Sequence, residues 1–169
     1  SISITGGTFK GVARGLYFPT AINTGTAITL TGVTAEVTGA SFAVVDFVGA
    51  LAGSLTIDGG AFTHPAVAGK GIWFQGAVTA AVAISGATVT SGTTAIVFGS
   101  LEAPLALTNV VATASLAHNG LSFQATTAAA TSIAITGGKF TGVERGIHFQ
   151  TAVNAGTAVT LSGVSAEGT

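Results

Sequence analysis

The feature that most constrains the fold of this sequence is a 15-residue segment that occurs twice. "ITGGTFKGVARGLYF" at residues 4–18 returns as "ITGGKFTGVERGIHF" at residues 135–149. Aligned at an offset of 131 positions, residues 1–38 and 132–169 are identical at 25 of 38 positions. Self-similarity at a fixed period is typical of repeat architectures. The fold of such a chain therefore depends on whether a shorter period lies inside the 131-residue one.

A shorter period is present and is marked by two motifs. The first is an apolar residue, a polar residue, Gly or Asn, and a small or apolar residue, and it begins at Ile4, Leu30, Ile57, Ile84, Leu107, Ile135 and Leu161, at spacings of 26, 27, 27, 23, 28 and 26 residues. The second, apolar-variable-Phe, ends at Phe18, Phe47, Phe74, Phe98, Phe123 and Phe149. Five short repeats therefore fill one 131-residue cassette, residues 1–131, whose first part returns at 132–169.

Each repeat has the pattern of strand, corner, strand and return. Apolar residues alternate at Ile2 and Ile4, and again at Leu16 and Phe18, which predicts two strands with one inward face each. Between them stand residues of the types that tolerate a positive φ angle. These corner positions are Gly6, Gly32, Gly59, Gly86, Asn109, Gly137 and Gly163.

This pattern predicts an all-β fold, a single-stranded right-handed parallel β-helix (β-solenoid). We expect one continuous solenoid over residues 1–169, with about 26 residues per turn, six to seven turns and no visible caps, and with the Phe residues in one internal column. A two-sheet sandwich also has regularly spaced short strands. It has no reason to repeat the same phrases in register.

Composition limits the partners of such a chain. Only 7% of residues are charged and the net charge is −1, so nucleic acid and anionic membranes are not expected as partners. The mean hydropathy of +0.72 invites a membrane interpretation, but Gly, Ser and Thr interrupt every long apolar run, so we expect no membrane insertion. The absence of Cys excludes disulfides and thiolate metal sites.

The corner motif followed by "G-[I/L]-x-F" resembles the repeats of right-handed parallel β-helices. It is most similar to the repetitive stalks of large bacterial surface adhesins and autotransporter passengers, and more distantly to the pectate-lyase-like superfamily. The resemblance covers the whole chain and is architectural. It implies a structural role at the cell surface or outside the cell.

Enzymes of that superfamily carry clustered Asp residues on adjacent turns, with Arg, Lys or His nearby. Asp46 and Asp58 stand in different columns here, and the Glu residues are scattered. We therefore expect no catalytic residues, no cofactor and no metal site, and we expect His64, His118 and His148 to be exposed polar residues.

One outward column suggests a ligand. Tyr17, Trp73 and His148 occupy equivalent positions before Phe, and Gln75, Gln124 and Gln150 follow Phe. Aromatic rings beside amides are suited to stacking on sugars and hydrogen bonding to them, so glycans are a candidate partner. The alternative is an ordinary exposed strand. Two Thr-rich outward rows on the first strand, interrupted by Ala83, Ala106, Ala134 and Asp58, suggest ice binding as a third function.

The favoured function is structural. Neither end of the sequence carries a polar cap, so we expect either a segment of a longer array or a subunit that stacks end to end with itself. The sequence thus predicts a repeat of an extracellular or cell-surface fibre or adhesin stalk. Carbohydrate binding is the second candidate.

Overall fold

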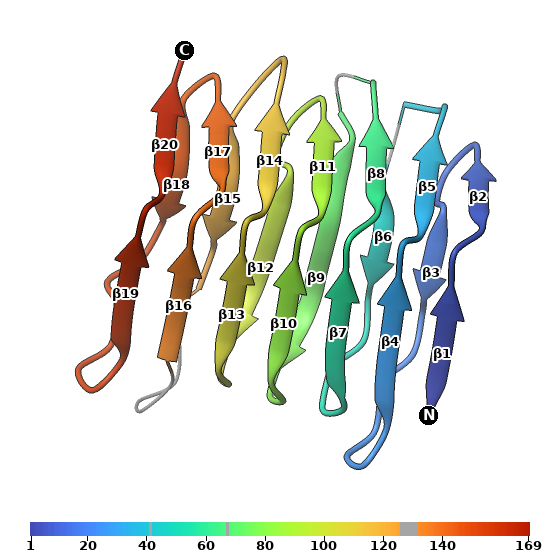
Figure 1. The fold of residues 1–169 in the computed structure, drawn as a ribbon, viewed down its shortest axis with the longest axis horizontal. Coiled ribbons are helices and arrows are strands. Elements are labelled where there is room, and N and C mark those ends of the chain that lie inside the picture. Colours follow the sequence, from blue (N-terminus) through green and yellow to red (C-terminus); the bar gives the residue numbers. More distant parts are fainter. Residues whose placement is uncertain (41, 67, 126–131) are drawn as a thin grey trace.

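The computed structural model describes residues 1–40, 42–66, 68–125 and 132–169, and these residues form an all-β structure of three parallel sheets. The prediction of a parallel β-solenoid is confirmed. Each turn contributes one strand to each sheet, and equivalent strands of successive turns are paired (Figure 1). None of the described residues belongs to a helix that could cross a membrane.

The strands of each sheet recur at every third position along the chain. Within the described residues the first sheet consists of β1 (Ile2–Thr5), β4 (Ala27–Thr31), β7 (Ser54–Asp58), β10 (Val82–Ser85), β13 (Leu105–Thr108), β16 (Ser132–Thr136) and β19 (Ala158–Ser162). The second consists of β2 (Thr8–Gly11), β5 (Thr34–Val37), β8 (Ala61–His64), β11 (Thr88–Ser91), β14 (Val111–Ala114), β17 (Lys139–Gly142) and β20 (Ser165–Gly168). The third consists of β3 (Leu16–Phe18), β6 (Ala43–Phe47), β9 (Lys70–Val78), β12 (Ile96–Leu101), β15 (Asn119–Phe123) and β18 (Arg145–Phe149).

The coil is right-handed. In Figure 1 the chain rises through β1 and β2 on the near side, descends through β3 on the far side and advances from right to left. A right-handed path is the strong preference for parallel strands joined by crossovers. The described residues make about six full turns, and a seventh begins with β19 and β20.

The corner between the first and second sheets is a left-handed backbone position in every described turn. The φ angle is 64° at Gly6, 60° at Gly32 and 66° at Gly59, and the same corner at Asn109 has a φ of 52°. Gly86, Gly137 and Gly163 complete this column with φ angles of 58°, 63° and 64°. The recurring Gly or Asn is therefore a consequence of backbone geometry at the corner.

The interior is organised as columns of like side chains. Phe18, Phe47, Phe74, Phe98, Phe123 and Phe149 form one stack, with ring centroids 4.5–5.4 Å apart and ring planes within 10° of parallel. In the middle of this stack the rings are at most 2% exposed. Burying each ring contributes about 2–3 kcal/mol, so the stack is a major part of the core.

The turn contains three strands, where the sequence pattern predicted two. The missed strands are those of the second sheet, which start directly after the corner. Their inward column mixes large and small residues instead of repeating one type. It reads Phe9, Ala35, Phe62, Val89, Ala112, Phe140 and Ala166. A Phe ring next to an Ala side chain fills about the same volume as two side chains of medium size. Because no single residue type recurs in this column, the sequence does not reveal these strands.

Candidate functional site on the outer face of the third sheet

The residues in the outward column of the third sheet differ in how deeply they are buried. Its six residues are in register across the described turns, in the order Tyr17, Asp46, Trp73, Val97, Ser122 and His148. Tyr17 is 48% exposed, but three others are buried: Asp46, Val97 and Ser122. The column therefore lies outside the sheet without being a uniformly exposed face, in contrast to the expectation from the sequence.

Asp46 is buried because the side chains around it fold over it. The Arg14 Nε atom donates a hydrogen bond to Asp46 Oδ2 at 2.6 Å, and the Gln75 Nε2 atom donates to Oδ1 at 2.7 Å. The Arg14 guanidinium also lies 4.2 Å from the ring centroid of Tyr17 and 3.9 Å from that of Phe42. This arrangement satisfies a buried carboxylate and occupies one face of the Tyr17 ring.

Trp73 is covered in a similar way. The Lys70 Nζ atom lies 4.0 Å from the Trp73 ring centroid. Burial lowers the pKa of Lys70 below its ordinary value, and the nearby Asp46 carboxylate partly opposes this by favouring the charged form. Of the six candidate ligand residues, Tyr17, Trp73 and Gln75 thus belong to a cluster of internal contacts around Asp46 and Lys70.

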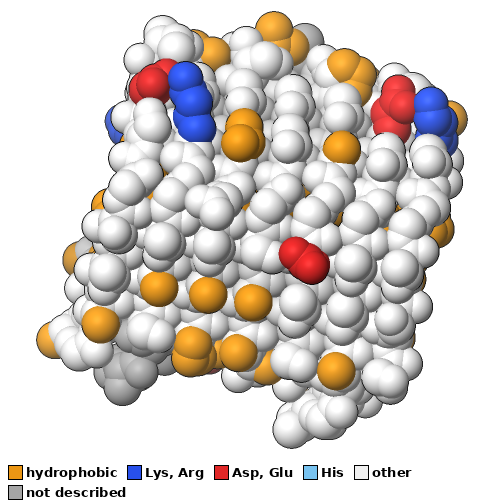
Figure 2. All heavy atoms as spheres, viewed as in Figure 1, with side chains coloured by type: hydrophobic (Ala, Val, Ile, Leu, Met, Phe, Trp, Pro, Cys, Tyr) orange, Lys and Arg blue, Asp and Glu red, His pale blue; other side chains and the backbone are white. Residues whose placement is uncertain are grey.

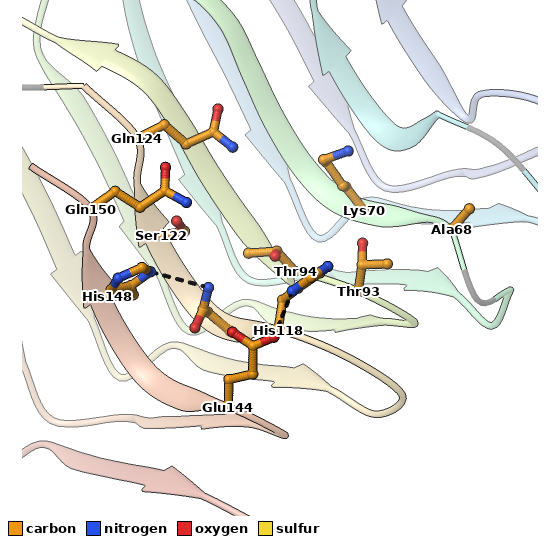
Figure 3. Close-up of a pocket in the computed structure, with 11 residues that line it drawn as sticks. Ala68, Lys70, Thr93, Thr94, His118, Ser122, Gln124, Glu144, His148 and Gln150 are labelled. Atoms are coloured by element: carbon orange, nitrogen blue, oxygen red, sulfur yellow. Dashed lines mark hydrogen bonds and ion pairs between the residues drawn. The ribbon is translucent and has the colours of Figure 1, made fainter.

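The other three candidates, His148, Gln124 and Gln150, line a cavity of about 380 Å³ that opens on the outer face of this sheet (Figure 3). In the outward column of this sheet the fourth turn has small side chains. Val97 lies between Trp73 and Ser122 in the outward column, and Gly99 stands where neighbouring turns have Gln.

Residues from four turns line this cavity, and all of them except Ala68 are polar or charged. Ala68 and Lys70 come from the third turn, Thr93 and Thr94 from the fourth, His118, Asn119, Ser122 and Gln124 from the fifth, and Glu144, His148 and Gln150 from the sixth. Figure 3 shows the two glutamines and His148 on one side and Lys70, Thr93 and Thr94 on the other, with His118 and Glu144 below.

Three interactions hold the cavity lining. The His118 Nδ1 and Glu144 Oε1 atoms are 3.0 Å apart, and the Arg145 Nη1 atom donates to the other oxygen of Glu144 at 3.2 Å. The Asn119 Nδ2 and His148 Nδ1 atoms are 3.4 Å apart. His118 has a φ of 59°, a conformation that is uncommon for residues other than Gly and that recurs at functional sites.

The histidines differ from the expectation that all three are exposed. His64 is fully buried at the end of β8, and its Nδ1 atom accepts a hydrogen bond from the Ala66 backbone N–H at 3.3 Å. His118 is exposed, as expected, and His148 is half-buried; both lie in the cavity lining described above. Within the described residues, no group of three His, Asp or Glu side chains has a metal-binding arrangement.

The outer face of the first sheet is smooth and almost uncharged (Figure 2). The two predicted Thr-rich rows run in register along it. Ala83, Ala106 and Ala134 interrupt one row. Asp58 interrupts the other, and its Oδ1 atom accepts a hydrogen bond from the Ser85 Oγ atom at 2.8 Å.

Sequence reasoning missed Lys70, Asn119, His118 and Glu144 as neighbours of the candidate glutamines. All four stand two or three positions before the inward apolar residue of their third-sheet strand, so aligning the turns at that residue is the signal that groups them. Comparison with protein-family models, curated proteins and solved structures finds no match for this chain.

Proposed function

We propose that this chain is a structural repeat of an extracellular or cell-surface fibre or adhesin stalk, in which stiffness is the function. The observation that carries the proposal is that most inward positions keep an apolar side chain in both copies of the repeated segment, whereas several outward positions change in chemical character. A rod requires its inter-turn contacts and leaves its outer surface free to vary.

Most of the interior keeps its apolar character in the second copy, with one exception, the buried Val37, which corresponds to Gly168. Leu16 corresponds to Ile147 and Ile28 to Val159, while Leu30 returns unchanged as Leu161. The outer face of the third sheet changes in character, since Tyr17 corresponds to His148 and Pro19 to Gln150, 131 residues later.

An ion pair between turns supports the same interpretation. The Lys10 Nζ atom lies 2.8 Å from Glu36 Oε2, between β2 and β5. In the second cassette the lysine has moved two positions along the strand, yet the Lys139 Nζ atom lies 2.9 Å from Glu167 Oε2, between β17 and β20. Figure 2 shows these two pairs at opposite ends of the second sheet. An exposed ion pair contributes at most about 1 kcal/mol to stability. We therefore infer that the recurring pair serves to align neighbouring turns more than to stabilise them.

The proposed partner is another copy of the cassette. In β4, Ile28 and Leu30 are buried beneath Leu55 and Ile57 of β7, with exposed fractions of 1% or less. Their counterparts in β19, Val159 and Leu161, are 39% and 53% exposed. A turn with the chemistry of β7 would bury them in the same register.

Joining cassettes in register tests this function. Proteins with one, two and three copies of residues 1–131 should form rods whose length grows by about 24 Å per cassette, five turns of about 4.8 Å each, at constant cross-section. Small-angle X-ray scattering and electron microscopy measure both quantities. Flexibly joined beads, or a cross-section that grows with copy number, would contradict the proposal.

The surface location needs its own test. Intact source cells treated with a non-permeating biotinylation reagent should yield labelled protein, while a cytoplasmic control protein stays unlabelled. Labelling that appears only after cell lysis would argue against a surface or extracellular fibre.

A further inference from the structure

We propose that the cavity on the outer face of the third sheet binds a neutral saccharide. The inference goes beyond the structural role and is independent of it, because a rod of stacked turns has no use for a polar hollow in its side. The ligand-facing groups are Gln124, Gln150 and His148 on one side, and the more deeply buried Thr94 and Ser122 on the floor.

The size of the cavity fits a small ligand. Its volume is about 380 Å³, within the range of small-molecule sites. Its lining comes from four successive turns, so it extends along the solenoid axis for about three inter-turn steps of about 4.8 Å. This length suits one or two sugar rings.

The chemistry of the lining fits hydroxyl groups. Each glutamine amide offers both donors and an acceptor, and each Ser or Thr hydroxyl both donates and accepts. A sugar hydroxyl also donates and accepts, so it can pair with either kind of group at every position. Aromatic stacking has no part in this proposal, because cations already lie over Tyr17 and Trp73.

The charges favour a neutral ligand over an anion. Lys70 brings one positive charge to the rim, and Glu144 brings one negative charge that His118 and Arg145 contact. The burial of Lys70 lowers its pKa, which makes its charged form less favourable there. Without an excess of positive charge, an anionic ligand gains little from this lining.

Asn119 lies at the back of the cavity lining, next to His148. Its side chain is 5% exposed and contacts His148 through Nδ2, while its Oδ1 atom has no hydrogen-bond partner. A buried acceptor without a donor is uncommon in native structures. The Oδ1 atom is closed off from the cavity as well as from solvent, so Asn119 contributes to the site through its Nδ2 contact with His148.

The chain contains its own reporter of binding. Trp73 is the only Trp, and Lys70 both covers its ring and lines the cavity. We expect the Trp fluorescence of the full 169-residue chain to change saturably on titration with at least one of four neutral probes, D-glucose, D-galactose, cellobiose and lactose. Isothermal titration calorimetry should give the same dissociation constant. D-galacturonate is the charged probe.

Three variants locate the site. Gln124→Ala and Gln150→Ala remove exposed side chains and should each weaken binding about tenfold. Ser122→Val fills the floor and should abolish binding, and it should fold because Val97 occupies the same column one turn earlier. Glu102→Ala removes an exposed side chain outside the cavity and should leave binding unchanged, provided that circular dichroism shows all four variants folded.

Three results would overturn the proposal. The first is no saturable signal with any neutral probe up to about 50 mM. The second is saturation with D-galacturonate alone, which would make this an anion site. The third is saccharide binding that survives Gln124→Ala, Gln150→Ala and Ser122→Val together, which would place the site elsewhere on the chain.

Discussion

Asn109 stands at a corner where the six equivalent described positions carry Gly, and this one exception explains what the corner requires. All seven residues have a φ between 52° and 66°. Asn is the residue other than Gly that most readily adopts this conformation. The requirement is therefore for a left-handed backbone, and not for the absence of a side chain.

The corner requirement can be measured at Gly32. Its φ is 60°, and a Cβ atom added there would meet no atom within 4 Å. Gly32→Ala should lower the free energy of unfolding by about 1–2 kcal/mol, entirely through backbone strain. Gly32→Asn should cost clearly less. Urea unfolding of both variants checks this, and an equal loss would refute the conformational explanation.

The Phe stack permits a comparison of buried and exposed rings. Phe74 is fully buried between Phe47 and Phe98, with ring centroids 5.0 and 4.6 Å away. Phe74→Ala should cost about 3–5 kcal/mol in the free energy of unfolding, because it leaves a cavity in the core.

Phe42→Ala is the matched control for that substitution. The Phe42 ring is 43% exposed and contacts the Arg14 guanidinium, so its removal should cost about 1 kcal/mol or less. Chemical denaturation compares the two variants. Similar losses at both positions would mean that the stack is not the core of the fold.

At the scale of the element, the third-sheet strands combine a predictable inner face with an unpredictable outer one. The inner face follows from the apolar-variable-Phe motif. The depth of the outer face depends on neighbours: Arg14 and Lys70 fold back over Asp46 and Trp73, whereas residues of four turns surround the cavity beside Ser122. Sequence reasoning thus identified Gln124, Gln150 and His148 as outward residues but could not predict that they share a cavity.

The two arginines of the cassettes form a natural pair for mutation. Arg14 is 22% exposed and neutralises the fully buried Asp46, whereas its counterpart Arg145 is 52% exposed and contacts the exposed Glu144. Arg14→Ala should cost about 3–5 kcal/mol because it leaves a buried carboxylate without its ion-pair partner. Arg145→Ala should cost less than about 1 kcal/mol.

Thermal and urea unfolding of the two arginine variants measure this difference directly. A loss at Arg145 as large as the loss at Arg14 would show that both arginines serve one structural role. It would also remove the buried Arg14–Asp46 pair as the explanation of why Tyr17, Trp73 and Gln75 are held together.

At the scale of the whole molecule, the repeat determines the architecture. The two recurring motifs predicted two of the three sheets. They missed the second sheet, because its inward column mixes Phe, Val and Ala. They predicted the stacking of turns correctly, because one inward face and one left-handed corner per turn suffice to specify it. The depth of the outer face depends on side-chain sizes that differ from turn to turn, so the repeat period does not predict it.

The central claim is that equivalent residues lie directly above one another along one axis, and distances between spin labels test it most directly. The chain has no Cys, so labels can be placed freely on the outward column that contains Thr5, Thr108, Thr136 and Ser162. Pulsed electron paramagnetic resonance should give separations of about 19 Å for Thr5 with Thr108, about 24 Å with Thr136 and about 29 Å with Ser162, a constant step of about 4.8 Å per turn. Distances that do not rise by a constant step along this column would contradict the solenoid.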